Sequence, residues 1–335
     1  MKAIKKFMLL PVMLNLFDGQ PNTQTTTTDG LTDEMKVYYS DYLIDLVEPE
    51  LVHDMFAQKH PIPKNGGKTI EFRQWDTLPE MTAPLTEGVT PDGQSLSMST
   101  VTATVEQYGG YVTLSDMFML TAIDPVLVVA TKAISSQAGR SLDTISREVL
   151  NSGTIVQYAE GQVTSRAALS YTDETTNHNL TARAVKMAVR FLESQDAPKI
   201  DGKWYGGIVH PYCKFDLTND EEWRKPHEYV DTENIYENEI GELYGVRFVQ
   251  SSRATKFEGA GANGADVYST LIMGGDAYGT TEVTGGGLQH ITKPLGSGGS
   301  SDPLNQRATC GWKATKVTEL LVPQYIVRIE TTATP

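Results

Sequence analysis

Residues 68–75 read KTIEFRQW and residues 95–116 read SLSMSTVTATVEQYGGYVTLSD, and these two stretches decide how the chain is built. In the first, the apolar residues Ile70 and Phe72 alternate with Glu71 and Arg73, which is the period of a half-exposed strand. The second stretch also alternates, but Ser and Thr occupy many of its positions, so it is β-prone and weakly hydrophobic. We therefore predict one very long two-stranded hairpin over residues 65–116.

The connection between the two arms is LPEMTAPLTEGVTPDGQ, residues 78–94. It contains three prolines and the turn dipeptide Asp92-Gly93, and it has no core pattern. A connection of this length is uncommon inside a compact domain. An isolated two-stranded ribbon is only marginally stable in water. We expect this hairpin to lie on another copy of the protein.

Length and composition favour two linked subdomains. The 335 residues exceed the usual size of a single core, and 39% of them are hydrophobic. The net charge of −14 argues against a surface that binds nucleic acid through phosphate contacts. Cys213 and Cys310 are far apart in sequence, so neither a disulfide framework nor a zinc site is supported, and a reducing cytoplasm is the simplest compartment.

The amino-terminal segment has two interpretations. Lys2, Lys5 and Lys6 precede the apolar run FMLLPVMLNLF, as in a secretory signal. Pro11 and Asn15 interrupt that run, however, and no cleavage site follows. The alternative is a flexible arm with an apolar end that contacts a neighbouring subunit. No later segment approaches the roughly 20 apolar residues of a membrane span, so we predict no membrane association.

One long helix is predicted over residues 124–151. Asp124 is the expected N-cap and Pro125 the first helical residue. Apolar residues then recur every three or four positions, the period of a helix with one buried face. Residues 200–290 alternate strand and helix patterns and resemble a compact α/β unit, with GELYGVRFVQSS read as one strand. The final strands, ATCGWKATKVTELLVPQYIVRIE, are expected to return to the long helix.

No chemical site is predicted. Gly259, Gly261 and Gly264 match G-x-G-x-x-G, but a strand-like run follows them where a dinucleotide site needs a helix, so we interpret them as a loop. His53, His60 and His210 do not cluster, and we expect each to be a satisfied or surface histidine. G-x-S-x-G and H-E-x-x-H are both absent from the sequence. We predict no catalytic residue, no cofactor, no metal and no enzymatic activity.

Two glycine pairs lie near the base of the predicted hairpin. Gly66 and Gly67 precede one arm, and Gly109 and Gly110 lie in the other. Permissive backbone at a similar height in both arms would make a hinge. The alternative is an ordinary pair of bulges. The hinge hypothesis predicts that alanine at these positions leaves monomers folded but traps assemblies in one shape.

The order of these elements resembles the HK97-type phage capsid subunit. Several strings also resemble the major capsid protein family of the N-four-like podophages: LTDEMKVYYSDYLIDLVEPELVHDMFAQKHPIPKNGGKTIEFRQW, PLTEGVTPDG, YGGYVTLSDM, AGRSLDTISREVLNSGT, EIGELYGVRFVQSS and DPLNQRATCGWKA. They cover most of the chain from residue 31 to about residue 329. The resemblance implies an α+β fold and a major capsid protein of a tailed bacteriophage.

The resemblance also implies a division of the chain. An N-terminal arm would span residues 1–60, and an extended loop, or E-loop, residues 61–115. A peripheral domain with the spine helix 124–151 would combine residues 116–197 and 301–335. An axial domain would span residues 198–300, and its tip loops, within 220–240 and 256–265, would meet at the five-fold and six-fold axes.

The implied function is assembly with copies of itself. Hexamers and pentamers would form an icosahedral shell in the virion, assembled in the host cytoplasm around double-stranded DNA that is not bound sequence-specifically. Further implied partners are a portal protein, a scaffolding protein and a decoration protein. Two rivals are an encapsulin-like compartment, which shares the fold and holds cargo enzymes, and an α/β enzyme, which the missing catalytic residues disfavour.

Inter-subunit contacts are predicted from charge. The E-loop tip would present Glu80, Glu87, Asp92 and Gly93 to an adjacent subunit. On that subunit we expect basic partners along the spine helix, namely Lys132, Arg140 and Arg147.

Overall fold

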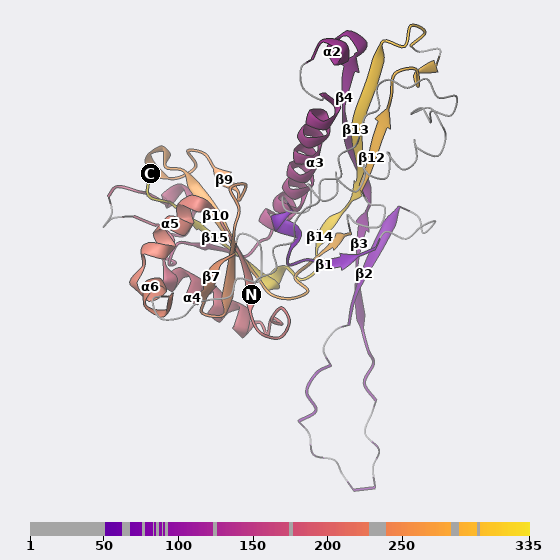
Figure 1. The fold of residues 1–335 in the computed structure, drawn as a ribbon. Coiled ribbons are helices and arrows are strands. Elements are labelled where there is room, and N and C mark those ends of the chain that lie inside the picture. Colours follow the sequence, from indigo (N-terminus) through magenta and orange to yellow (C-terminus); the bar gives the residue numbers. More distant parts are fainter. Residues whose placement is uncertain are drawn as a thin grey trace, which may run out of the picture.

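The computed structural model describes residues 51–61, 68–75, 78–82, 84, 87–88, 90, 93–122, 126–173, 177–227, 239–282, 288–299 and 302–335. Figure 1 shows three parts: a slab in which one long helix covers a sheet, a rounded α/β body, and a thin hairpin that projects away from both. Residues 1–50 of the predicted N-terminal arm, together with Gly66, Gly67, Asp92, Asp124 and Pro125, lie outside the described residues.

The projecting hairpin consists of β2 (Thr69–Trp75) and β3 (Met98–Thr104). The strands are antiparallel, with Thr69 opposite Thr104 and Trp75 opposite Met98. Ile70 and Phe72 face a small core that also contains Val317 and Leu321, which anchors the base of the hairpin to the rest of the chain. The two predicted arms are therefore confirmed over this length. The segment between them, residues 76–97, extends away from the slab and has neither helix nor strand among its described residues (Figure 1).

The hairpin is shorter than predicted, because its return arm changes partner at Val105. The amide of Val105 donates to the carbonyl of Lys68 at 2.8 Å and closes the ladder. Beyond it, β4 (Glu106–Ser115) pairs along its whole length with β13 (Arg307–Lys316). The more buried residues are odd-numbered up to this point, at Ala103 and Val105, and even-numbered in β4, at Tyr108, Gly110 and Leu114, so the buried face shifts by one residue where the partner strand changes. Residues 106–115 thus belong to the slab.

The slab is built from an antiparallel sheet with strand order β12-β13-β4, where β12 is Leu288–Lys293. The helix α3 (Val126–Asn151) lies along one face of this sheet, and the short helix α2 (Asp116–Thr121) follows β4 at the far end (Figure 1). At 1.5 Å per residue the 26-residue helix α3 is about 39 Å long. This confirms the helix predicted from periodicity. Its apolar stripe meets every second residue of β13, and the shared core is Ile134, Ala138, Leu142, Cys310, Trp312 and Ala314.

The rounded body contains a seven-stranded sheet. Its main path runs in the order β5-β15-β10-β6-β8-β7, and β9 pairs with β10. The strands are β5 (Val156–Tyr158), β6 (Tyr205–Val209), β7 (Glu239–Leu243), β8 (Val246–Gln250), β9 (Lys256–Phe257), β10 (Val267–Met273) and β15 (Ile326–Thr331). The same core also contains residues of three helices, α4 (Ala182–Ser194), α5 (Pro211–Asn219) and α6 (Glu221–His227). Thr181 caps α4 by accepting a hydrogen bond from the Ala184 amide.

The predicted domain boundaries do not follow these sheets. The seven-stranded sheet takes β5 from residues 116–197 and β15 from residues 301–335, and α4 packs in the same core. Conversely β12, from the range 198–300, belongs to the slab. The final strands therefore separate: β13 returns to the long helix as expected, but β15 enters the body. Local patterns identify strands and do not identify their distant partners.

The stretch predicted as one strand at residues 241–252 is instead the hairpin of β7 and β8. Tyr244 and Gly245 form its turn, with φ angles of 52° and 74°. Two successive residues with positive φ give the backbone twist that favours a tight hairpin. Tyrosine is not a usual turn residue, so the sequence did not indicate the reversal.

A small sheet of β1 (Gln58–His60), β11 (Tyr278–Thr281) and β14 (Thr318–Leu320) lies where the slab, the body and the hairpin meet. The residues just before β1 form a 3₁₀ turn at Val52–Asp54. Val52 and Phe56 pack with Leu150 of α3 and Trp204 beside β6. The segment 51–60 therefore joins slab and body through its side chains.

Candidate assembly surface

The chemical motifs of the sequence form no reactive site. Residues 259–264 lie in a loop between β9 and β10 with no helix after them, so the loop interpretation of this G-x-G-x-x-G is confirmed. No group of three or more His, Cys, Asp or Glu that could hold a metal occurs within the described part of the chain. Within the same residues, no helix has both the length and the apolar character needed to cross a membrane.

Each histidine singled out in the sequence has its own partner. His53 is buried beside Asp143, the ring of His60 lies edge-on to Phe72, and His210 accepts a hydrogen bond from the amide of Tyr212 at the start of α5. The interpretation as satisfied side chains is confirmed for His210 and for Nδ1 of His53, whereas the Nε2 atoms of His53 and His60 are buried and have no hydrogen-bond partner.

Cys310 lies close to a histidine but is not an activated nucleophile. Its Sγ is 3.2 Å from Nε2 of His290. Burial raises the pKa of the Cys310 thiol, and burial lowers the pKa of His290. Both shifts favour the neutral forms, whereas a reactive cysteine needs a thiolate. Cys213 is buried as well, which raises its pKa to about 12.

A buried polar cluster fixes the segment 51–60 to α3. The His53 amide donates to Oδ1 of Asp143 at 2.9 Å, and His53 Nδ1 lies 2.9 Å from Oδ2 of the same carboxylate. Burial would raise the pKa of Asp143, but the hydrogen bonds and charge of His53, together with the charge of Lys316, lower it overall. Tyr278 donates its hydroxyl to the His53 carbonyl at 2.6 Å, so β11 joins the same cluster.

A second ion pair extends this cluster to β13. Lys316, whose side chain is 0% exposed, donates to Oδ2 of Asp54. Ser146 of α3 donates to Oδ1 of the same carboxylate at 2.5 Å. Removing one member of such a buried pair is strongly destabilising, because the other charge is left without compensation. The cluster therefore holds the segment 51–60 against α3 and β13.

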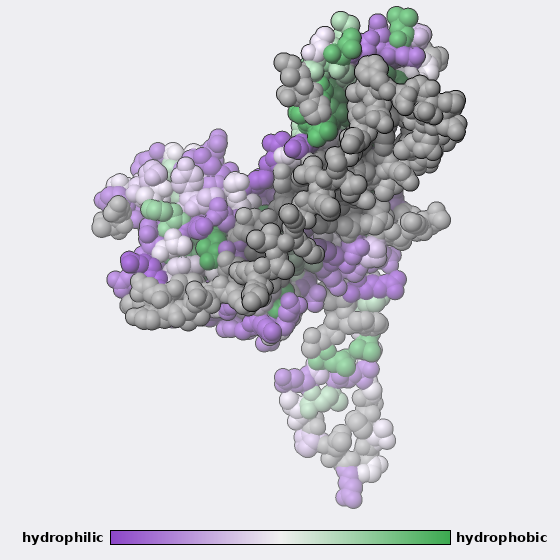
Figure 2. Space-filling view, viewed as in Figure 1, coloured by the Kyte–Doolittle hydropathy of each residue, from purple (hydrophilic) through white to green (hydrophobic). Residues whose placement is uncertain are grey.

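The predicted E-loop residues lie on the projection. Glu80, Glu87 and Gly93 are exposed there, while Asp92 is outside the described residues. The same segment exposes the apolar side chains of Leu78, Met81 and Leu96. Figure 2 shows hydrophobic atoms along this thin projection, away from either core. Three large apolar side chains in water, together with acidic ones, are typical of a surface that a partner covers.

The predicted basic partners on α3 divide into two groups. Lys132 and Arg140 are exposed on the side of the helix that faces away from the sheet. Arg147 is turned toward the body, where its Nη1 donates to the carbonyl of Arg253 at 2.9 Å. Arg147 is thus engaged within its own subunit, so only the other two remain candidates for an inter-subunit contact.

Gly109 and Gly110 do not lie in the hairpin ladder. They pair with Lys313 and Trp312 across β4 and β13. A Cβ at Gly109 would lie 2.8 Å from the carbonyl oxygen of Trp312, and one at Gly110 would lie 2.9 Å from Oε1 of Gln137. These glycines therefore permit close approach within the slab. The paired geometry on which the hinge hypothesis depended is absent for them, because β4 has a different partner strand.

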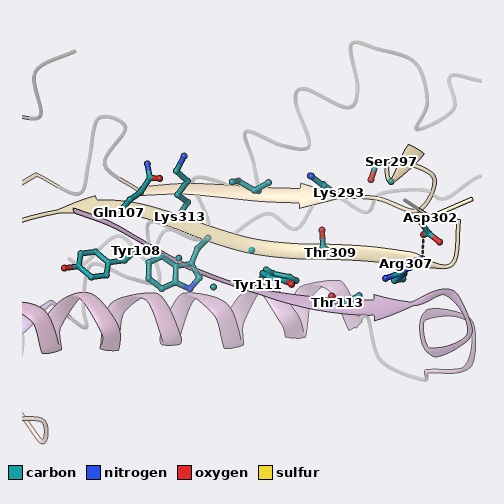
Figure 3. Close-up of a pocket in the computed structure, with 16 residues that line it drawn as sticks. Gln107, Tyr108, Tyr111, Thr113, Lys293, Ser297, Asp302, Arg307, Thr309 and Lys313 are labelled. Atoms are coloured by element: carbon teal, nitrogen blue, oxygen red, sulfur yellow. Dashed lines mark hydrogen bonds between the residues drawn. The ribbon is translucent and has the colours of Figure 1, made fainter. Parts of the chain in front are cut away.

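The sheet face opposite α3 carries a groove that the sequence analysis did not anticipate. It has a volume of about 680 Å³ and is lined by Gly109, Tyr111, Ile291, Lys293, Gly311 and Lys313, among others. In the ladder, Gly311 lies opposite both Tyr111 and Ile291, and Lys313 lies opposite Gly109. Figure 3 shows Lys293 and Lys313 extending to the side away from the long helix. Along β13, Cys310, Trp312 and Ala314 face the helix, so the residues between them, Gly311 and Lys313, must face outward. This alternation was the sequence signal that could have indicated the outward face.

A second exposed apolar area surrounds α2. Met117, Phe118 and Leu120 of this helix are exposed, and so are Val112 of β4 and Val129 of α3. Figure 2 shows this area as the hydrophobic end of the slab, far from the projecting loop. Apolar surface therefore occurs at both ends of the elongated subunit.

Solved structures with the same architecture are phage capsids. The capsid of Ralstonia phage GP4 matches with a TM-score of 0.65 and 14% identity, covering 86% of this chain and 91% of that chain. The capsid of cyanophage P-SCSP1u matches with a TM-score of 0.62 and 12% identity, covering 85% and 89%. The SrpI encapsulin of Synechococcus elongatus matches less well, with a TM-score of 0.50 and 9% identity, covering 86% and 89%. No curated protein matches this chain.

The projecting hairpin, the long helix on its sheet and the separate α/β body define the HK97-type capsid fold, an α+β architecture. The family model described as phage capsid protein matches residues 99–329, more than half of the chain. The chain belongs to the phage capsid protein family and is a major capsid protein, a structural protein of the phage shell. The narrower resemblance to the N-four-like podophages stays a prediction.

Proposed function

We propose that copies of this chain join as hexamers and pentamers and close an icosahedral shell around the double-stranded DNA of a tailed bacteriophage. The projecting segment 76–97 carries this proposal. It exposes Leu78, Met81 and Leu96 beside Glu80 and Glu87, and no core of its own subunit covers them. Such a segment gains stability only when it lies on another subunit.

Repetition of a modest contact is the assembly mechanism. Each loop lies on the adjacent subunit of the same ring, so every subunit gives one contact and receives one, and the ring closes. Stable protein interfaces commonly bury roughly 1,200–2,000 Å². An extended loop adds area that two rounded domains in contact do not supply. The sum over a closed shell is large even when each contact is weak.

The slab and the rounded body take different positions in the proposed shell. The slab of α3 with β4, β12 and β13 is the peripheral domain, and the body around the seven-stranded sheet is the axial domain. The tip loops that meet at the five-fold and six-fold axes are within residues 220–240, of which 228–238 lie outside the described residues, and within 256–265. This division replaces the boundaries expected from the sequence and follows the sheets.

Further partners follow from the same function. A portal protein, a scaffolding protein and a decoration protein are the proposed binding partners. The genome is enclosed without sequence-specific contacts, which agrees with the net charge of −14. We propose assembly in the host bacterial cytoplasm and a final location in the virion.

Electron microscopy of the purified full-length protein, alone and together with its scaffolding protein, tests the proposal. We expect closed shells or hexameric rings in negative stain. A uniform monomer or dimer under both conditions would refute it.

An encapsulin-like compartment is the second candidate, because the SrpI encapsulin shares the fold. The two functions differ in what the shell contains. Shells isolated from infected cells should contain nuclease-protected DNA if the phage function is correct, and cargo protein without DNA if the compartment function is correct.

A further inference from the structure

We propose that His210 is an acid-sensitive switch, and that protonation of its imidazole releases the first turn of α5 from the sheet of the rounded body. The neutral imidazole holds this turn as a hydrogen-bond acceptor, and the protonated ring cannot. The inference goes beyond the proposed shell function and does not depend on it, because the switch belongs to the folded subunit. Three observations carry it: the helix cap, the aromatic rings around it and the charges near it.

The imidazole of His210 caps α5. Its Nδ1 accepts a hydrogen bond from the amide of Tyr212 at 3.3 Å, and its backbone is extended, with φ −75° and ψ 146°. Pro211 has no amide hydrogen, so the Tyr212 amide is the first donor of the helix. The caps of α2 and α4 are the hydroxyl groups of Ser115 and Thr181, which do not titrate. A protonated imidazole has two N–H donors and no acceptor, so the cap of α5 is lost on protonation.

Two tyrosine rings fix the imidazole where α5 meets β10 and β9 in the body (Figure 1). The ring of Tyr212 is stacked on that of His210, with centroids 5.5 Å apart and an interplanar angle of 10°. Tyr268 of β10 contacts the same ring, with centroids 4.7 Å apart. Rotation of the imidazole would break this stack, and it would not restore an acceptor, because both nitrogens of the protonated ring are donors. Both tyrosines end in hydroxyl groups, so neither brings a carboxylate to the ring.

The charges around His210 oppose its protonation. Lys256 of β9 is the cation that faces the ring, and the carboxylate of Asp266 holds it at 2.8 Å. From α5, the ammonium of Lys214 donates to Oε1 of Gln250, at the end of β8. The amino terminus of a helix carries a partial positive charge of its own. Among the residues that the structure describes, no carboxylate is bonded to the imidazole. Burial and the charge of Lys256 lower the pKa of His210 below its ordinary value of 6.5.

The direction of the pH dependence follows from this lowered pKa. The unfolded chain binds the proton at His210 more readily than the folded subunit does. The stabilising effect of the cap is therefore complete above pH 6.5, and it is lost as the pH falls from 6.5 through the folded pKa. Acidification thus weakens the start of α5.

The change is local to one end of the helix. Cys213 and Leu217 of α5 are buried in the core of the body, so they hold the rest of the helix in place. The released turn carries Tyr212, which is 51% exposed, and Phe215, which is 57% exposed, follows three residues later. Protonation therefore alters the exposed aromatic surface of α5 in a subunit that stays folded.

Hydrogen exchange of the full-length, unassembled protein tests the switch. The exchange rate of the segment 210–219 is measured by mass spectrometry between about pH 7.5 and about pH 5 and divided by the intrinsic rate at each pH. We expect the protection of this segment in wild type to fall about fivefold or more over that range, the effect of losing a helix cap. The segment 181–194 serves as the internal control, because the hydroxyl of Thr181 caps it at every pH in the range.

Two substitutions at position 210 separate the cap from its titration. In His210→Asn the side-chain oxygen accepts the same hydrogen bond and does not titrate, so protection should stay constant from about pH 7.5 to about pH 5. His210→Ala has no acceptor and should show low protection throughout. His290→Asn is the matched control on β12, since burial also lowers the pKa of His290. That variant should respond to acid as wild type does.

Nuclear magnetic resonance of histidine-labelled protein gives a second measurement, which does not depend on the folding of the alanine variant. The signal that disappears in His210→Asn should titrate below pH 6.5. A signal that titrates above pH 6.5 would overturn the proposal, and so would an equal loss of protection in wild type and His210→Asn. Both measurements use single subunits, so a protein that forms no shells would contradict the proposed function and leave this inference standing.

Discussion

The imidazole of His53 and the carboxylate of Asp143 meet in the interior of the protein, with Nδ1 2.9 Å from Oδ2 and both side chains fully buried. His53 precedes the hairpin in sequence, and Asp143 lies in the carboxyl-terminal half of α3. Their contact fixes the segment 51–60 to the long helix. Asp54 and Lys316 repeat the arrangement toward β13. A buried polar cluster thus fixes the segment 51–60 to the slab, while the apolar core of Ile70 and Phe72 with Val317 and Leu321 anchors the hairpin itself.

We predict that Asp143→Ala lowers the free energy of unfolding by about 3–5 kcal/mol, because it leaves the His53 ring and amide buried without their acceptor. Urea unfolding of unassembled subunits measures the change. Glu148→Ala is the control, since that carboxylate is on the same helix but 72% exposed. Equal changes in the free energy of unfolding for the two substitutions would show that the buried pair stabilises the subunit no more than an exposed carboxylate on the same helix does.

The same pair predicts a pH dependence. The folded pKa of Asp143 lies below its ordinary value of 3.8, so its stabilising effect is present above that value and is lost as the pH falls through the folded pKa. We expect the stability difference between wild type and Asp143→Ala to be constant near neutral pH and to shrink below about pH 4. Unfolding curves between about pH 7 and about pH 3 test this. A difference that grows on acidification would contradict the assignment.

Gly109→Ala should destabilise the subunit itself by about 1–3 kcal/mol, because the new Cβ would lie 2.8 Å from the backbone oxygen of Trp312 and the strands must move apart. Thermal unfolding of the unassembled protein is the measurement. Gly93→Ala is the control, since nothing lies within 4 Å of its added Cβ. The hinge hypothesis expects the opposite result, a subunit of normal stability whose shells are trapped in one shape.

Replacement of residues 80–94 by a short turn should leave the subunit folded and abolish shells. The segment packs on neither core, so its loss removes no buried contact among the described residues. Circular dichroism and electron microscopy of the same preparation test both halves of the prediction. Particles of normal size from this variant would show that the loop is dispensable for assembly.

Local patterns in the sequence predicted the elements well and their partners poorly. The 3.6-residue period of α3 and the alternation in β2 and β13 each depend on one face that is buried, and such a face is visible in the sequence. The change of partner at Val105 was not predicted, because the composition stays β-prone on both sides of it and only the buried face shifts, from odd-numbered residues in β3 to even-numbered residues in β4. The Tyr244-Gly245 turn was missed because no typical turn residue stands at its first position.

The candidate site was predictable only in part, because some of its features are local in the sequence and others are not. The acidic, apolar and proline-containing loop is a local feature, so its exposure followed from composition. The groove on the outer face of the slab sheet is lined by residues from three strands, among them Tyr111, Lys293 and Lys313, which are far apart in sequence. No local pattern joins them, and only the strand order β12-β13-β4 brings them onto one face.

The strand order has a consequence for synthesis. β13 is the central strand of the slab sheet, and β15 lies between β5 and β10 in the body. A chain translated only to residue 300 would therefore lack an interior strand in both sheets at once, although it already carries the projecting loop. The slab sheet cannot be completed until residue 316 has been synthesised, and the sheet of the rounded body cannot be completed until residue 331 has been synthesised. Because of this topology, a chain truncated before β13 lacks the central strand of the slab and presents no folded slab to a neighbouring subunit.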